Sequence, residues 1–340
     1  MKIGLWIDEE GLRIDEVGAT AKAAEDSGID RIWFSQRTGW DALTLIAGAA
    51  PFTSTIRLAV GVVPVYPRHP LALASQALSV QAVTGNRLTL GIGSSHPAII
   101  EGMYGLPMEQ PAKYMREYVE ALGPLLTGEP TTYAGERLTA RGQIQITGAE
   151  TPELILAALG LRMLKIAGEL TAGTTTSWAG PEVIEDFIRP TIDQAATAAG
   201  RPQPQVIAGA CVALTDDADA TRDWIRARFG AAGDMPAYRA VLDRGGKAGP
   251  EDTAALGDVH HRQRLREQRR TRLGQHHALG APLEERDLQV PFQRGDRGTH
   301  RALHHVQPPS SQREAPLMRH RHEVLQLPQL HGKIVRKDRR

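Results

Sequence analysis

Short segments made almost entirely of apolar residues alternate with longer segments of mixed polarity along the first two thirds of the chain. The short segments are rich in Val, Ile and Leu, which is typical of strands buried on both faces. In the longer segments, apolar residues recur at helical spacing, as at Val17, Ala21 and Ala24. The predicted strands are 2–8, 31–35, 56–63, 87–93, 153–159, 172–178 and 205–214.

This alternation predicts an α/β fold in which helices cover a parallel sheet. Seven strand–helix units fit a TIM-type (β/α)8 barrel that is incomplete at its eighth unit. Residues 131–146 interrupt the alternation and are expected to form a hairpin or loop excursion. A doubly wound sheet is the alternative, but the sequence GIGSSHP at 91–97 lacks the third glycine of a dinucleotide-binding turn.

The composition changes abruptly near residues 249–258. Residues 256–340 contain 18 Lys and Arg but 9 Asp and Glu, whereas the whole chain has a formal net charge of +1. They also hold ten of the twelve histidines, and Phe292 is their one aromatic residue. We therefore expect a barrel over 1–258 and an irregular, basic tail rich in His and Arg over 259–340.

Three interpretations of the tail remain open. It could be a disordered basic arm that binds nucleic acid or a membrane surface, a metal-binding segment, or the product of a shifted reading frame. The last is favoured because the break is abrupt. Nucleic-acid binding is disfavoured because the tail lacks interleaved aromatic residues for base stacking. Its paired histidines are adjacent rather than four apart, which argues against metal binding, and residues 283–292 could supply a makeshift eighth strand.

Other features narrow the class of protein. No run of 18 apolar residues is present, so no transmembrane helix is expected. Residues 1–11 include acidic residues and do not resemble a signal peptide, which favours a cytoplasmic setting. Cys211 is the single cysteine, so the sequence excludes an internal disulfide and a cysteine-based zinc site.

Three stretches resemble one known family. They are GVVPVYPRHP at 61–70, TGNRLTLGIGSSHP at 84–97 and AALGLRMLKIAGELTAG at 157–173, with weaker support from AEDSGIDRIWFS at 24–35. In order and spacing they resemble the luciferase-like oxidoreductases that use FMN or the deazaflavin F420. The resemblance covers about residues 1–258, is closer to the F420 branch, and leaves FMN as the alternative.

The resemblance implies a chemistry for the barrel. The cofactor would exchange a hydride with a small organic substrate, or, if it is FMN, take part in monooxygenation. A homodimer is also implied. The third strand would end in a bulge with a non-prolyl cis peptide at Gly61–Val62, and this bulge would back the cofactor ring. A tight turn leading into the next helix is the alternative for the same stretch.

Matching the family motifs gives candidate site residues. His96 and Gln36 are the catalytic candidates, His96 because imidazole titrates near neutral pH. The implied cofactor-binding residues are Asp8, Ser35, Gly61, Val62, Val63, Gly93, Ser94, Ala158, Leu159, Gly160 and Thr174. No metal site is expected. Ordinary structural roles remain open: a helix cap or loop charge for Asp8, a polar turn for Ser35 and Gln36, and a loop or substrate-binding role for His96.

A function of another class is also open. If the tail replaces the eighth unit, the protein could be an inactive barrel remnant or a binding protein that acts through its basic arm. His69, within the sequence RHP, is expected to close a turn rather than act on a substrate.

Overall fold

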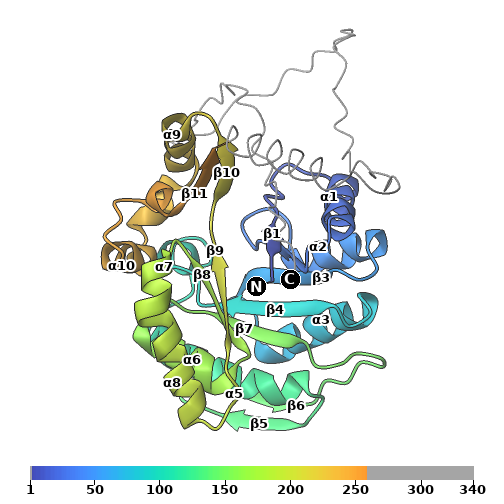
Figure 1. Ribbon diagram of the computed structural model, residues 1–340. Coiled ribbons are helices and arrows are strands. Elements are labelled where there is room, and N and C mark those ends of the chain that lie inside the picture. Colours follow the sequence, from blue (N-terminus) through green and yellow to red (C-terminus); the bar gives the residue numbers. More distant parts are fainter. Residues whose placement is uncertain (1, 259–340) are drawn as a thin grey trace, which may run out of the picture. The chain divides into compact units, whose positions relative to one another are not determined.

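The computed structural model describes residues 2–258, which lie within one compact unit of the chain (Figure 1). Seven parallel strands form one sheet, in which the spatial order of the strands follows their order in the chain. The strands of this sheet are β1 (Gly4–Trp6), β2 (Arg31–Phe34), β3 (Arg57–Pro64), β4 (Leu88–Gly93), β7 (Glu153–Ala157), β8 (Gly173–Ser177) and β9 (Gln205–Gly209). The barrel-type α/β architecture predicted from the sequence is confirmed.

Helices separate the strands and cover the outer face of the sheet. The buried core joins helix residues such as Leu45 and Leu73 to strand residues such as Phe34 and Leu90. The helices are α1 (Ile14–Asp26), α2 (Ala42–Ala49), α3 (Pro70–Val83), α4 (Pro97–Ile100), α5 (Pro111–Leu126), α6 (Leu161–Leu170), α7 (Pro181–Val183), α8 (Arg189–Ala198), α9 (Ala218–Phe229) and α10 (Pro236–Arg244). A π-helical turn, Ile184–Ile188, joins α7 to α8. None of the described helices is long and apolar enough to span a bilayer.

The excursion predicted at residues 131–146 is an antiparallel hairpin of β5 (Thr131–Ala134) and β6 (Thr139–Gly142). The buried carboxylate of Glu117 on α5 holds its turn by accepting the backbone N–H groups of Arg137 and Leu138 at 2.8 and 3.1 Å. His69 Nε2 lies 2.8 Å from the carbonyl oxygen of Thr139, and its Nδ1 accepts the N–H of Leu71. The prediction that His69 closes a turn is therefore confirmed.

The predicted strand 205–214 is wrong in its extent. It divides into β9 and a separate strand β10 (Val212–Thr215), which pairs in parallel with β11 (Ala255–Asp258). Strand β11 was not predicted, because its residues ALGD carry too little apolar pattern. The other predictions for the tail, including an eighth strand at 283–292, concern residues outside those described.

Side chains that meet across the inside of the sheet show that it curves into a barrel. Arg31 on β2 pairs with Glu153 on β7 at 2.9 Å, although β3 and β4 lie between these strands. The same carboxylate accepts the hydroxyl of Thr89 at 3.0 Å and the side-chain amide of Gln205 at 2.5 Å. One polar cluster therefore links β2, β4, β7 and β9 at the amino-terminal end of the barrel.

Strand β3 contains the irregularity that the family resemblance predicted. The peptide bond between Gly61 and Val62 is cis, and the pairing with β4 changes register between Val60 and Val63. A methyl group on Gly91 of β4 would lie 2.1 Å from the carbonyl oxygen of Val60. The bulge therefore fits against β4 only because residue 91 has no side chain.

A carboxylate on α1 organises the turn that precedes β3. Glu25 accepts the backbone N–H groups of Ser54, Thr55 and Ile56 at 2.6–2.9 Å, and also the hydroxyl of Thr55. Burial raises the pKa of Glu25, but these hydrogen bonds outweigh that effect and lower the pKa to about 2. The ionised form of Glu25 is thus favoured by folding.

We expect Glu25→Ala to lower the free energy of unfolding by about 1–3 kcal/mol near neutral pH, because three N–H groups lose a charged acceptor. The folded pKa lies below the ordinary value of 4.5, so the contribution is complete above that pH and disappears as the pH falls through about 2. Urea unfolding at several pH values measures this. Asp26→Ala is the control, since Asp26 makes only an exposed pair with Lys22. An equal effect of both variants would refute the role of Glu25.

Candidate functional site

The carboxyl-terminal ends of the parallel strands carry the candidate site. Side chains alternate across a strand, so every second residue faces the inside of the barrel. At the carboxyl end this inner layer includes six small residues, namely Ser35, Gly61, Gly93, Ala157, Ser177 and Gly209, beside the large ring of Trp6 at the end of β1. The small residues keep the inner wall shallow around the Trp6 ring.

Trp6 lies on the inside of this end of the barrel. A methyl group on Gly61 would lie 2.6 Å from the Trp6 ring, and one on Gly209 would lie 3.6 Å from it. Because β1, β3 and β9 are not neighbours, only a ring inside the barrel can reach both glycines. Trp6 stacks on Trp33 with 5.7 Å between ring centroids, yet Trp6 remains 36% exposed. It therefore presents an aromatic face at the mouth.

The glycines of β4 fit closely against the bulge. A methyl group on Gly93 would lie 2.7 Å from Val62 Cγ2 and 3.4 Å from Ala157 Cβ. Gly61, Val62 and Gly93 are thus brought together, as expected for a shared surface. Val63 differs, because its side chain is fully buried in the core on the helix side of the sheet, so only its backbone belongs to the bulge.

Ser35 and Gln36 end β2 in different ways. The Ser35 hydroxyl accepts the indole N–H of Trp6 at 2.7 Å and so fixes the Trp6 ring. The Gln36 side-chain oxygen accepts the N–H of Ala42 at 2.9 Å, and its amide nitrogen lies 3.5 Å from the carbonyl oxygen of Trp40. Both ends of the Gln36 amide therefore bond to the loop that leads into α2.

Asp8 belongs to an ion cluster at the mouth. Its carboxylate pairs with Arg37 from the loop after β2 and, at 3.3 Å, with Arg228 from α9. Arg228 also pairs with Glu10. The neighbouring Glu9 is buried, which raises the pKa of its carboxyl group. The cluster links the segment after β1 to α9. The carboxylate of Asp8 is thus already paired with two guanidinium groups.

The turn after β7 has the features expected of a phosphate site. Gly160 is the N-cap residue of α6 in an extended conformation, no side chain caps the helix, and a methyl group on Gly160 would meet nothing within 4 Å. Arg162 is exposed in the first turn of α6. The free N–H groups of a helix start, the positive end of its dipole and a nearby guanidinium all attract an anion.

Thr174 supports this turn from behind. It is fully buried, and its hydroxyl accepts the N–H of Ala158 at 3.1 Å. Ala158 is buried and Leu159 partly buried in the core on the helix side. These three residues shape the turn, whereas Gly160 is the exposed residue that faces solvent.

His96 follows β4 as the N-cap residue of α4 and is only partly exposed. Burial lowers its pKa below the ordinary 6.5. The preceding residues are Ser94, whose hydroxyl lies 3.4 Å from the carbonyl oxygen of Ser95, and Ser95 itself, with a left-handed φ of 61°. A left-handed backbone in a non-glycine residue at a strand exit is typical of functional sites.

Several residues at the mouth were missed from the sequence. Tyr238 on α10 packs against His96, and Ser177 ends β8 beside it. Trp178 has a φ of 60° and packs against Phe229, with 5.5 Å between ring centroids. Proline at residue 236 and the glycine pair after 244 mark α10 as a helix, but no sequence pattern places it against β4.

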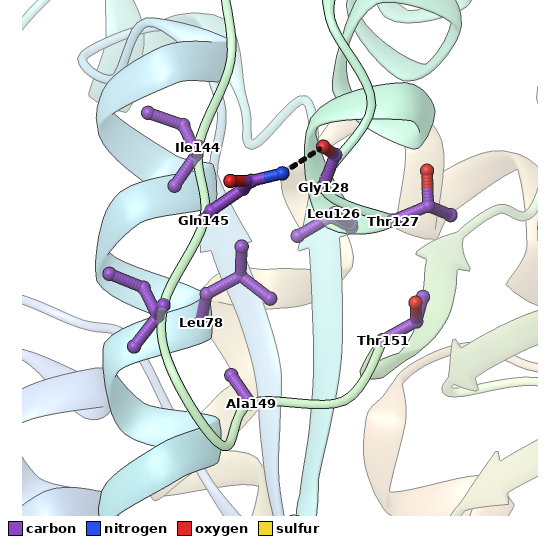
Figure 2. Close-up of a pocket in the computed structure, with 9 residues that line it drawn as sticks. Leu78, Leu126, Thr127, Gly128, Ile144, Gln145, Ala149 and Thr151 are labelled. Atoms are coloured by element: carbon purple, nitrogen blue, oxygen red, sulfur yellow. Dashed lines mark hydrogen bonds between the residues drawn. The ribbon is translucent and has the colours of Figure 1, made fainter.

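Figure 2 shows a pocket that lies away from the carboxyl ends of the strands. Its volume is about 180 Å³. It is lined by Leu78 of α3, by Leu126 at the end of α5 and the two residues after it, and by the segment 144–151 that leads into β7. Gln145 crosses it and donates to the carbonyl oxygen of Gly128 at 3.4 Å. Because residues 144–151 enter the amino-terminal end of β7, this pocket is not part of the candidate site.

Comparisons with known proteins agree with this geometry. The chain is 30% identical over 248 residues to the 5,10-methylenetetrahydromethanopterin reductase of Methanolobus tindarius, covering 70% of this chain and 74% of that one. The structure of the coenzyme F420-dependent tetrahydromethanopterin reductase from Methanopyrus kandleri superimposes with a TM-score of 0.62 at 25% identity. That similarity covers 73% of this chain and 76% of the other.

The fold is also shared with enzymes that hold FMN. The oxygenating component of 3,6-diketocamphane monooxygenase from Pseudomonas putida, solved with FMN, superimposes with a TM-score of 0.56 at 19% identity, covering 72% of this chain and 76% of that one. The family model for luciferase-like monooxygenases matches residues 1–287, beyond the composition change near residue 258. The chain belongs to the luciferase-like monooxygenase family.

Proposed function

We propose that the protein is an F420-dependent oxidoreductase that transfers a hydride between the deazaflavin and a small organic substrate. The observation that carries this proposal is the inner layer of small residues at the carboxyl end of the barrel, with the β3 bulge at its centre. The similarity to the methanopterin reductases, which are described as F420-dependent in the solved structure, favours the deazaflavin.

The residues present fit a flat tricyclic ring. Val62 and Gly93 would back one face of the ring, and Gly61 would contribute to the bulge behind Trp6, because these residues pack closely and leave a shallow surface. The exposed face of Trp6, held by Ser35, would lie beneath it. The hydroxyl of Thr175, buried without a hydrogen-bond partner among the described residues, adds a polar atom to the inner wall.

The phosphate end of the cofactor would lie at Gly160 and the start of α6. Ala158, Leu159 and Thr174 would shape that turn without contacting the anion through their side chains. Asp8 and Ser94 would border the ring end of the site. We assign Gln36 to ordering the loop after β2, because both ends of its amide already bond to the backbone.

A bound deazaflavin or flavin supplies the hydride chemistry, and the chain must bind it, exclude water and move protons. His96 is the proposed proton-handling residue. Its lowered pKa keeps the imidazole neutral near pH 7, so it can accept a proton from a substrate held at the mouth. The family resemblance also predicts a homodimer, which light scattering on the purified protein would test.

Reconstitution tests the cofactor assignment. The purified protein is mixed with F420 or FMN in equal excess, and the retained cofactor is identified by absorbance after gel filtration. We expect retention of F420 in preference to FMN. Preferential retention of FMN would favour a flavin monooxygenase, in line with the FMN-containing structural relative. Retention of neither by a folded protein would refute the proposal and favour the inactive remnant.

A further inference from the structure

The phenol ring of Tyr238 packs against the imidazole of His96. Their centroids are 4.7 Å apart and their planes are tilted by 54°. Tyr238 lies on α10, after β9 and β10, whereas His96 directly follows β4 in the middle of the sheet. Helix α10 therefore reaches over the mouth of the barrel to the candidate proton-handling residue.

Tyr238 also lies beside the barrel wall. The side chain of Ser177, the last residue of β8, is near enough to the phenol to affect its titration. Burial raises the pKa of Tyr238 and Ser177 opposes the rise, so the phenol stays protonated near neutral pH. Ser177 pairs in register with Gly209 of β9 on the inner face of the sheet. The Tyr238 ring therefore contacts His96 on one side and lies near the end of β8 on the other.

Burial of the imidazole, rather than a nearby charge, lowers the pKa of His96. On the loop after α4, Glu101 accepts the N–H of Met108 at 3.2 Å. On α10, Arg239 and Asp243 pair with each other at 2.7 Å. The last residue of β8, Ser177, is uncharged. These neighbouring charges therefore have other partners, and the Tyr238 ring is one of the groups that pack against the imidazole.

We propose that Tyr238 is a positioning residue whose packed ring holds His96 after β4 and keeps the imidazole oriented for proton transfer. This inference rests on the proposed function of His96. Removal of the ring would expose the imidazole to water, whereas removal of the hydroxyl alone would leave the packing surface in place. The two changes therefore separate the effect of the ring from that of the hydroxyl.

The test is the titration of His96 in the cofactor-free protein, followed by NMR of the imidazole protons and assigned by their loss in His96→Gln. We expect Tyr238→Ala to raise the titration midpoint by at least about half a pH unit, toward the ordinary value. Tyr238→Phe should keep the midpoint close to that of the wild type. Ser177→Ala should raise it by less than Tyr238→Ala, because the ring of Tyr238 still packs against the imidazole.

Tyr104→Ala is the control, since Tyr104 lies in the loop after α4 with 47% of its surface exposed. It should leave the midpoint unchanged. An unchanged midpoint in a folded Tyr238→Ala protein, shown by circular dichroism, would overturn the proposal. If that variant does not fold, Tyr238→Leu replaces it, and its midpoint decides in the same way.

The test of the Tyr238–His96 pair can fail or succeed independently of the test of the proposed function. Cofactor binding is measured in parallel by fluorescence titration of the same proteins. A shifted midpoint without cofactor binding supports the Tyr238–His96 pair and refutes the proposed oxidoreductase. Cofactor binding without a shifted midpoint refutes the pair alone. With an identified substrate, Tyr238→Ala should lower kcat and move its pH profile, while cofactor affinity, set at the Gly160 turn, stays unchanged.

Discussion

Replacement of Gly160 with leucine is expected to weaken cofactor binding about 100-fold, or by about 2.7 kcal/mol, while the barrel stays folded. The backbone at residue 160 has φ −99° and ψ 156°, a conformation open to any residue. A side chain there would meet no protein atom within 4 Å of its Cβ, so the fold has no reason to resist the change. It would instead occupy the space in front of the free N–H groups of α6.

The effect should fall on affinity rather than on hydride transfer, because the turn is proposed to hold the phosphate and not the ring. Fluorescence titration of F420 against both proteins measures it. Gly123→Leu is the matched control: Gly123 lies in α5, also with nothing within 4 Å of its Cβ, and away from the carboxyl ends of the strands. Equal affinities for wild type and a folded Gly160→Leu protein would place the phosphate elsewhere, and the assignment of residues 158–160 would be withdrawn.

Replacement of Gly91 with alanine is expected to destabilise the protein by about 3 kcal/mol. The added methyl group would lie 2.1 Å from the carbonyl oxygen of Val60 and 3.0 Å from Val62 Cγ1. The first contact is with backbone, which cannot be relieved by a change of rotamer. Strand β4 would have to move away from the bulge of β3, and inter-strand hydrogen bonds would weaken.

The same substitution at Gly123 provides the comparison. Gly123→Ala adds a methyl group to the interior of α5, where nothing obstructs it, and alanine favours a helix over glycine by about 0.5–1 kcal/mol. Urea unfolding of the two variants should therefore shift in opposite directions from the wild type. A Gly91→Ala protein as stable as the wild type would mean that the bulge does not pack on β4 as described.

Local sequence predicted the strands of the barrel well. Short, mostly apolar stretches such as 31–35 and 87–93 are typical of strands buried on both faces of a covered parallel sheet, so the local sequence was enough to locate them. The family motif around Gly61 and Val62 also located the bulge. The family motif at 157–173 likewise pointed to Gly160, which the structure places at the turn from β7 into α6.

The exact partners of the strands could not be predicted in the same way. Residues 205–214 are apolar enough for one strand, but they divide because β9 pairs with β8 while β10 pairs with β11. Where the stretch divides depends on which strand lies beside each half, and the local pattern of apolar residues does not contain that information. The role of Gln36 has the same origin: its amide is drawn to the backbone near Ala42 by a loop whose path depends on α2.

The local sequence therefore indicated the succession of strands and helices along the chain, the bulge, and the residue types at each strand end. Which of those ends meet depends on the tertiary fold. Trp6 reaches both Gly61 and Gly209, and Tyr238 reaches His96, because the sheet curves and brings distant strands to one mouth. Contacts of this kind depend on the closure of the sheet and on which face each side chain takes, and these are properties of the whole barrel.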